Sequence, residues 1–281
     1  MNPVTELQAG ALRLALRPDL GGCIAGLWHG DRPVLHSFDP ARLTGSRPSA
    51  CFPLVPYSNR IGRRRFHWQG QEIELAANVD EPNTLHGVGW QRPWEVVSAE
   101  ATRAELRYAH RADAFWPFDF EARQHFELEP RALRLRMSVR NTDARVQPLG
   151  FGWHPYFSKR PGCWLRARVS QRWEPDETLL PVRRVAQDGI DGDVLQMDYD
   201  NVFEGWDGEA LTGDGHFSVR ISSDQPYLVV FAKAVRDHYC VEPVSHLNNA
   251  IQQADPEAHG LRAVAPGQGL EGWMNLDITI P

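Results

Sequence analysis

The feature that most constrains the fold is a two-residue alternation of apolar and polar side chains that recurs along the chain. In residues 132–140, ALRLRMSVR, four apolar side chains alternate with arginine or serine, and residues 11–17, ALRLALR, and 273–280, WMNLDITI, have the same period. This period is typical of a β-strand with one buried and one solvated face. Residues 227–232, YLVVFA, are apolar throughout, which predicts a strand buried on both faces.

The connections between these segments indicate an antiparallel arrangement. Residues 65–75, RFHWQGQEIEL, have the pattern of a hairpin with its turn at Gln69-Gly70. Helical periodicity is scarce, and 23 glycines with 21 prolines interrupt the chain at short intervals, which favours all-β packing over βαβ units. We therefore predict a large antiparallel sandwich and one domain over residues 1–281. Residues 187–214 are expected to be loop with short structure.

Composition and charge exclude several classes of function. Thirty basic against thirty-six acidic residues give a net charge of -6, opposite to the basic excess typical of a nucleic-acid-binding protein. No apolar run is long enough to span a bilayer, and the first ten residues lack the pattern of a signal peptide. The four cysteines are far apart in the sequence and form no Cys-x-x-Cys pair, so we expect reduced thiols in a cytoplasmic protein.

Two of the histidines have unusual sequence surroundings. His154 lies in GFGWHPYF, among aromatic residues and directly before a proline, and His86 lies in NTLHGVGW. We interpret Gly87 and Gly89 as allowing close approach of a ligand. A lone histidine is more often structural or solvated than catalytic. That interpretation applies to His29, His36, His67, His110, His125, His216, His238 and His259.

Two acidic residues are candidates for acid–base chemistry. Glu242 lies in YCVEPVSHLNNA, after an apolar stretch and before a proline, where a strand is expected to end at a cleft. Its apolar neighbours should raise its pKa toward neutrality, as a general base requires. Asp200, in DYDNVFEGW, is the second candidate, although an Asp-Asn turn that caps its own loop is an equally good interpretation.

Arginines cluster in CFPLVPYSNRIGRRRFHW. Arg60 follows the apolar, proline-braced part of this segment, so its guanidinium is a candidate for donating hydrogen bonds to sugar hydroxyls in a pocket. Arg63, Arg64 and Arg65 have the pattern of a solvated charged face.

Taken in order, five segments resemble the aldose 1-epimerase, or mutarotase, family. They are PYSNRIGRRRFHWQG, NTLHGVGWQRPWEV, GFGWHPYF, DYDNVFEGW and VEPVSHLNNAI, and they run from Pro56 to Ile251. The resemblance implies a large antiparallel β-supersandwich. It also implies an isomerase that interconverts the anomers of a free sugar by ring opening, rotation about C1–C2 and reclosure, with neither a metal nor an organic cofactor.

The resemblance also implies roles for individual residues. Glu242 would take the proton of the anomeric hydroxyl, and His154 would protonate the ring oxygen. The residues implied to hold or orient the sugar are Arg60, His86, Asp200 and Asn59. Asp198 lies two residues from Asp200 and is the alternative at that position. The expected partner is a small-molecule sugar, and both a monomer and a homodimer are compatible with the sequence.

Other functions fit parts of the pattern. A non-catalytic carbohydrate-binding protein would share the sandwich and the polar cleft. A hexose-6-phosphate mutarotase would need basic residues at the phosphate, for which Arg63, Arg64 and Arg65 are candidates. A glycoside hydrolase needs two carboxylates, and Asp200 with Glu242 would leave the histidines unexplained. A metal site of His86, His154 and Glu242 would lack a short-spaced ligand pair, so we predict no metal.

Overall fold

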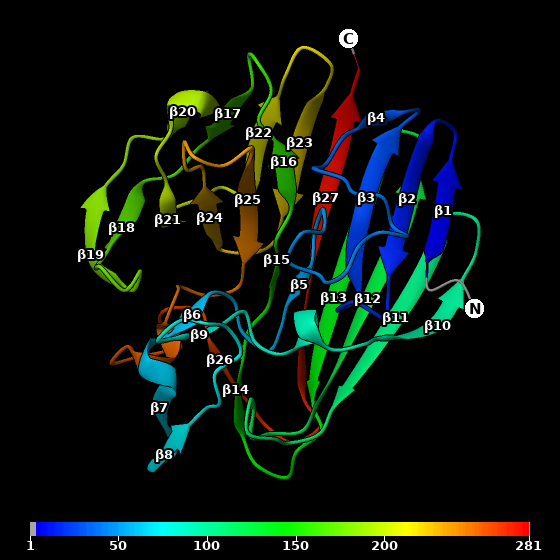
Figure 1. Ribbon diagram of the computed structural model, residues 1–281. Helices are drawn as coiled ribbons and strands as arrows, with labels where there is room; N and C mark the ends of the chain where they lie inside the picture. The colour runs from blue at the N-terminus through cyan, green and yellow to red at the C-terminus, as the bar shows by residue number, and fades with distance from the viewer. Residues whose placement is uncertain (1–3, 281) are drawn as a thin grey trace.

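The chain folds almost entirely into antiparallel β-structure (Figure 1). The computed structural model describes residues 4–280, and within them all pairs of named strands are antiparallel and no α-helix occurs. The same residues contain no helix with the length and apolar character needed to cross a membrane. The predicted all-β antiparallel architecture is confirmed.

The largest sheet has nine strands. In spatial order they are β10 (Glu95–Ala99), β11 (Arg103–His110), β12 (Phe120–Glu129), β13 (Ala132–Asn141), β27 (Gly269–Thr279), β23 (Ser218–Ser223), β22 (Glu209–Gly213), β17 (Trp164–Ala167) and β20 (Ile190–Asp193). Along β13 the apolar side chains that alternate with arginine and serine are buried, as their period predicts.

A second sheet has eight strands and carries the residues discussed below. Its order is β19 (Pro181–Ala186), β18 (Gln171–Pro175), β21 (Asp200–Glu204), β24 (Tyr227–Phe231), β25 (His238–Val244), β15 (Gly152–Trp153) and β5 (Pro53–Leu54), with β16 (Tyr156–Ser158) also paired to β25. Four of the five residues of β24 are buried, in agreement with the prediction from its continuous apolar run.

Smaller elements complete the fold. A four-stranded sheet contains β1 (Thr5–Ala9), β2 (Leu12–Arg17), β3 (Cys23–His29) and β4 (Arg32–Pro33). The two-stranded pairs are β6 (Arg60–Ile61) with β9 (Thr84–Leu85), β7 (Arg65–Trp68) with β8 (Gln71–Glu74), and β14 (Gln147–Leu149) with β26 (Arg262–Val264). Single 3₁₀ turns occur at η1 (Gly62–Arg64), η2 (Gly89–Gln91), η3 (Val194–Gln196) and η4 (Ala250–Gln252). The β7–β8 hairpin turns at Gln69-Gly70, as predicted.

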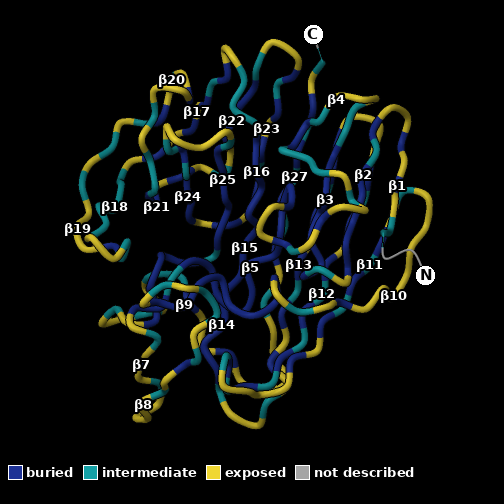
Figure 2. Tube along the Cα trace, in the orientation of Figure 1, coloured by how far each residue is buried: buried dark blue, intermediate teal, exposed yellow. Residues whose placement is uncertain are grey.

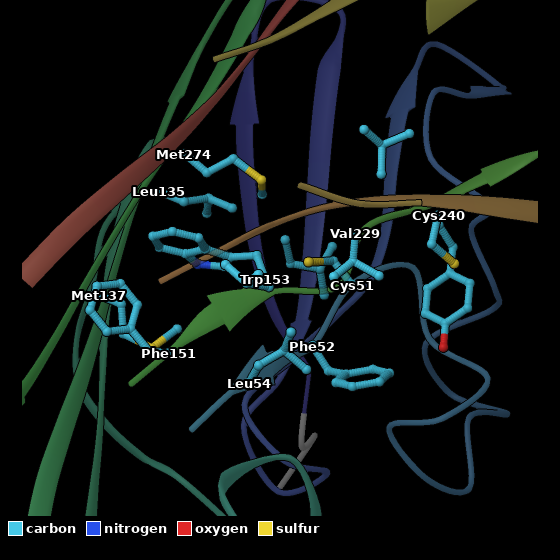
Figure 3. Close-up of a cluster of buried hydrophobic side chains, with 14 of the residues drawn as sticks. Cys51, Phe52, Leu54, Leu135, Met137, Phe151, Trp153, Val229, Cys240 and Met274 are labelled. Atoms are coloured by element: carbon cyan, nitrogen blue, oxygen red, sulfur yellow. The ribbon is translucent and has the colours of Figure 1, made fainter. Parts of the chain in front are cut away.

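The nine-stranded and eight-stranded sheets share a buried core (Figure 2). Trp153 of β15 points toward Leu135 and Met274 of the larger sheet, whereas Phe52 and Cys240 lie away from them (Figure 3). Full burial of an apolar side chain such as Leu135 contributes about 1.5–3 kcal/mol to stability. This core supports one face of β15, β16 and β25 and leaves the other face for the cleft described below.

The structure bears on two further sequence-based expectations, one about residues 187–214 and one about the four cysteines. Residues 187–214, expected to be loop with short structure, contain the short strands β20, β21 and β22 joined by loops and the 3₁₀ turn η3. These strands have only four or five residues each, too few for a clear alternation to show in the sequence. All four cysteines are buried, and the structure pairs none of them in a disulfide.

Candidate active site

A cleft of about 640 Å³ lies over the eight-stranded sheet and brings together all six side chains selected from the sequence. These are Asn59, Arg60, His86, His154, Asp200 and Glu242. Other residues that line the cleft are Arg47, Phe52, Glu81, Trp90, Tyr156, Val229, Phe231, Arg236, His238 and Cys240.

Strand register aligns the side chains that form the floor of the cleft. Phe231 of β24 lies between Asp200 of β21 and Cys240 of β25, and Cys240 is in turn opposite Tyr156 of β16. Glu242 follows on the same face of β25, because side chains two apart in a strand point the same way. The strand continues through Pro243 to Val244, so the expectation that it ends at Glu242 is wrong.

His154 and Glu242 face each other at the base of the cleft. Nε2 of His154 lies 3.4 Å from Oε1 of Glu242, and the two side chains are 11% and 3% exposed. The second carboxylate oxygen, Oε2, and the histidine Nδ1 are both buried and have no hydrogen-bond partner in the protein. An unpaired buried polar atom is costly, so the fold bears an energetic cost at both groups.

Aromatic rings hold the His154 imidazole in a slot. The rings of Phe52 and Tyr156 stack against it, each with its centroid 4.5 Å from the imidazole centroid. The His154 backbone N–H donates to the Phe52 carbonyl oxygen at 3.1 Å. The aromatic residues of GFGWHPYF thus divide by face: Trp153 packs in the core, and Tyr156 fixes the orientation of the histidine.

Burial disfavours the charged form of each member of this pair. Desolvation lowers the pKa of His154 to about 3 and raises the pKa of Glu242 well above its ordinary value. The nearby Asp200 carboxylate raises the pKa of Glu242 further, and the Arg60 guanidinium lowers it. The contact at 3.4 Å acts in the opposite direction, since it favours an imidazolium–carboxylate ion pair.

His86 is positioned by a reciprocal pair of hydrogen bonds with Asn59. The Asn59 backbone N–H donates to His86 Nδ1 at 3.0 Å, and the His86 backbone N–H donates to the Asn59 carbonyl oxygen at 2.8 Å. Burial lowers the pKa of His86 well below its ordinary value, so the ring is neutral. Because Nδ1 accepts a hydrogen bond, the single ring proton is on Nε2, which is available as a donor.

The glycines beside His86 have a different role from the one predicted. A Cβ atom on Gly87 would lie 2.3 Å from the Val55 carbonyl oxygen, and one on Gly89 would lie 2.3 Å from Val55 Cγ1. Gly87 also has a positive φ of 69°, a conformation that glycine adopts without strain. The two glycines therefore allow the protein's own backbone to approach closely, and this packing presents His86 to the cleft.

Arg60 is held by an acidic residue that sequence reasoning missed. Its Nε donates to Glu81 Oε2 at 3.1 Å, and Arg47 Nη2 lies 3.8 Å from the other oxygen of Glu81. The Arg60 side chain is only 11% exposed. Glu81 lies in a turn-rich stretch, NVDEPN, with no pattern that distinguishes it.

The structure separates the two aspartates of DYDNVFEGW. Asp200 begins β21 and lines the cleft, and desolvation raises its pKa. Asp198 is 77% exposed and pairs with Lys233 at 3.0 Å. The interpretation of Asp200 as a turn residue is therefore wrong.

The structure also places the three neighbouring arginines and His238. Arg63 and Arg65 are exposed, Arg64 is half-buried, and none of the three lines the cleft. Arg65 instead pairs with glutamates of the adjoining hairpin strand. His238, expected to be structural or solvated, lines the cleft, and nothing in its immediate sequence indicates this position.

The potential metal ligands in the cleft differ from the set considered in the sequence. Within the described residues, one group of potential donor atoms that lie within 4.8 Å of one another is formed by His154, Cys240 and Glu242, without His86. Burial raises the pKa of the Cys240 thiol well above its ordinary value. A metal would bind the thiolate form of Cys240, which burial disfavours.

Comparison with known proteins gives concordant matches. The family model for aldose 1-epimerase matches residues 3–277. The uncharacterized protein YphB of Escherichia coli K12 is 32% identical over 294 residues, which cover 98% of each chain. The crystal structure of a putative aldose 1-epimerase from Escherichia coli K12 has a TM-score of 0.89 at 29% identity and covers 99% of both chains. A GalM/aldose epimerase homologue from C. elegans, at 16% identity, shares the fold with a TM-score of 0.81 and covers 99% of this chain and 98% of that one.

Proposed function

The chain belongs to the aldose 1-epimerase family, and we propose that it interconverts the α and β anomers of a free aldose. The observation that supports this proposal most strongly is the buried His154–Glu242 pair, with its 3.4 Å contact and its unpartnered carboxylate oxygen. Ring opening requires that one proton leave the anomeric hydroxyl and another reach the ring oxygen. Since both oxygens are bonded to the same carbon, an acid and a base that serve them must lie close together.

The proton transfers balance across the pair. In the forward step the Glu242 carboxylate takes the proton of the anomeric hydroxyl while the His154 imidazolium donates a proton to the ring oxygen. The C1–O5 bond breaks and C1 becomes an aldehyde. After rotation about C1–C2, the C5 hydroxyl attacks the other face of the aldehyde. His154 takes back the proton of that hydroxyl and Glu242 returns a proton to the aldehyde oxygen, so both residues are restored.

The electrostatics of the pair support this cycle. The pair holds one proton both before and after ring opening: first as imidazolium with carboxylate, then as neutral imidazole with carboxylic acid. Burial favours the second arrangement, whereas the short contact and Arg60 favour the first. Opposing influences of this kind keep the two arrangements closer in free energy, as reversible general acid–base catalysis requires.

The other lining residues are proposed to bind and orient the sugar. The Nε2–H of neutral His86 and the guanidinium of Arg60 donate to sugar hydroxyls, and Asp200 accepts from them. Asn59 contributes by fixing the ring of His86 and by accepting the Arg60 backbone N–H at 3.0 Å. Trp90 supplies an apolar wall of the cleft, suited to the C–H face of a pyranose.

Polarimetry on freshly dissolved α-D-glucose and α-D-galactose tests the proposal. The wild-type protein should speed the decay of optical rotation well above the buffer rate, and Glu242→Gln should abolish that acceleration while still binding the sugar in calorimetry. If the wild type binds the sugars without accelerating mutarotation, the protein is a carbohydrate-binding protein. If it neither binds nor accelerates across a panel of free and phosphorylated aldoses, the proposed function is wrong.

A further inference from the structure

We propose that His36, Asp237 and His238 form a binding site for a divalent transition-metal ion, with Zn²⁺ as the preferred ion, at the rim of the cleft. The site is separate from the acid–base pair, and anomer interconversion as proposed above does not use it. The donor atoms of these three residues lie within 4.8 Å of one another. Two imidazoles and one carboxylate make up a ligand set that Zn²⁺ accepts, whereas Ca²⁺ and Mg²⁺ prefer oxygen ligands alone.

The distances already approach those of a metal centre. His238 Nδ1 lies 2.9 Å from Asp237 Oδ1, and His36 Nε2 lies 3.9 Å from Asp237 Oδ2. Ligand atoms around a tetrahedral Zn²⁺ are about 3.3 Å apart. Small side-chain rotations would therefore bring three donors to one ion, and the fourth position would remain for water or a sugar hydroxyl, because His238 also lines the cleft.

Backbone hydrogen bonds hold the segments that supply the three ligands. The His36 backbone N–H donates to the Tyr156 carbonyl oxygen at 2.7 Å, and the Lys159 backbone N–H donates to the Asp237 carbonyl oxygen at 2.7 Å. Ser158 of β16 is opposite His238 of β25, two strands that lie side by side in Figure 1. The ligands therefore come from segments distant in sequence but fixed to one another before any ion binds.

A second contact orients the His36 imidazole as a metal site requires. His36 Nδ1 lies 2.9 Å from Ser158 Oγ. This contact can fix the tautomer that leaves Nε2 free as a ligand toward Asp237. The His36 ring packs edge-on against Phe38 with centroids 5.0 Å apart, and the His238 ring packs edge-on against Tyr156 at 5.1 Å.

The local charge allows a cation to bind. Asp237 is 79% exposed, so an ion can reach it from solvent. The Arg160 guanidinium, which lowers the pKa of His36, is paired with the Asp214 carboxylate at 2.6 Å. Its Nη2 also donates to the Pro33 carbonyl oxygen at 2.7 Å.

Isothermal titration of the chelator-treated full-length protein with ZnCl₂ at neutral pH tests the site. The wild type should bind one Zn²⁺ per chain, and Co²⁺ should show the visible absorption of a low-coordinate site. His36→Gln and Asp237→Asn should each lower the affinity by about tenfold or more, and Ser158→Ala should lower it by about tenfold through loss of the orienting contact. His67→Gln, which changes an exposed histidine of the β7–β8 hairpin, should bind as the wild type does.

Two outcomes would overturn the proposal, and neither depends on mutarotase activity. One is a wild type that binds no more Zn²⁺ than a protein without the site, or variants at His36 and Asp237 that bind it unchanged. The other is Zn²⁺ binding that survives in those variants but is lost in Glu242→Gln, which would place the ion at the acid–base pair. Circular dichroism of each variant establishes that it is folded.

Discussion

His154 in the cleft and His110 on β11 are both buried histidines surrounded by aromatic rings, but the protein uses them differently. At His110 both ring nitrogens have partners: Nε2 donates to the Trp116 carbonyl oxygen at 2.9 Å, and Nδ1 lies 2.8 Å from the Tyr108 hydroxyl. At His154 one nitrogen has no partner and the other faces a carboxylate. Burial lowers the pKa of both. Hydrogen-bond satisfaction, rather than burial, therefore separates a structural histidine from a candidate catalytic one.

His246 extends the comparison to a histidine close to the cleft segments. Its Nε2 accepts the Ser58 backbone N–H at 3.0 Å, and its Nδ1 lies 2.8 Å from the Leu247 carbonyl oxygen. Both of its ring nitrogens therefore have hydrogen-bond partners. Through these bonds His246 links the segment that carries Asn59 to the segment that follows β25. Its position within the motif VEPVSHLNNAI is thus explained by structure without any contact to a substrate.

The largest expected effect is that of Glu242→Gln. Removing the general base should lower kcat by about a thousandfold or more, within the range for a single acid–base group. Stability should be unchanged or higher, because a neutral amide replaces a buried carboxyl group whose pKa burial has raised. Polarimetry measures the first effect and urea unfolding the second. A variant that keeps a tenth of the wild-type rate would show that Glu242 is not the base.

A matched pair of histidine variants tests the comparison directly. His154→Asn should lower kcat by about a hundredfold or more with little loss of stability. His110→Asn should destabilise the protein by about 1–3 kcal/mol, because it leaves buried partners unsatisfied, while kcat per folded molecule stays within about twofold. Equal losses of activity in the two variants would mean that satisfaction of the ring nitrogens does not distinguish their roles.

The free energy of unfolding should depend on pH because of buried histidines such as His246, whose ring nitrogens are both hydrogen-bonded. Burial lowers the pKa of His246 to about 4, whereas an unfolded histidine titrates near 6.5. The unfolded chain therefore binds a proton at His246 more readily than the folded protein does. The contribution of His246 to the free energy of unfolding is complete above about pH 6.5 and is lost as the pH falls toward 4. Between pH 6.5 and 5 the loss is about 2 kcal/mol for one such group.

Replacement of His246 isolates this contribution. His246→Gln should flatten the decrease in unfolding free energy between pH 6.5 and 5 by about 2 kcal/mol, measured by urea titration at each pH. His67→Gln, at an exposed position, is the control and should keep the wild-type slope. An unchanged slope in His246→Gln would show that this imidazole is not held neutral by the fold.

The smallest effect distinguishes the two neighbouring aspartates. Asp200→Asn should raise KM about tenfold, the cost of weakening one hydrogen bond that a sugar hydroxyl donates to a charged carboxylate. Asp198→Asn should change KM by less than about twofold, since an exposed ion pair such as that with Lys233 contributes little. Initial rates over a range of sugar concentrations measure both. The reverse order would assign the substrate-facing position to Asp198.

Sequence reasoning identified the cleft residues that lie in recognisable motifs and missed those that do not. Phe52 and Tyr156 are present in the quoted segments, but their role as the walls of the His154 slot depends on stacking that no local pattern encodes. Glu81 and His238 have ordinary sequence contexts and reach the cleft only because distant strands bring them there. The interpretation of residues 1–281 as one domain remains a prediction.

The sequence by itself determined the all-β architecture, because a two-residue period can bury one face only as a strand, and it determined which types of side chain were available for acid–base chemistry. Tertiary structure alone decided their spacing. The pairing of Val229 with Glu242 and the position of His154 after β15 set the 3.4 Å contact, and the shared core on the other face of these strands supports it. Register and packing depend on residues far apart in the chain, so the distance between two side chains from separate motifs emerges only when the strands pair.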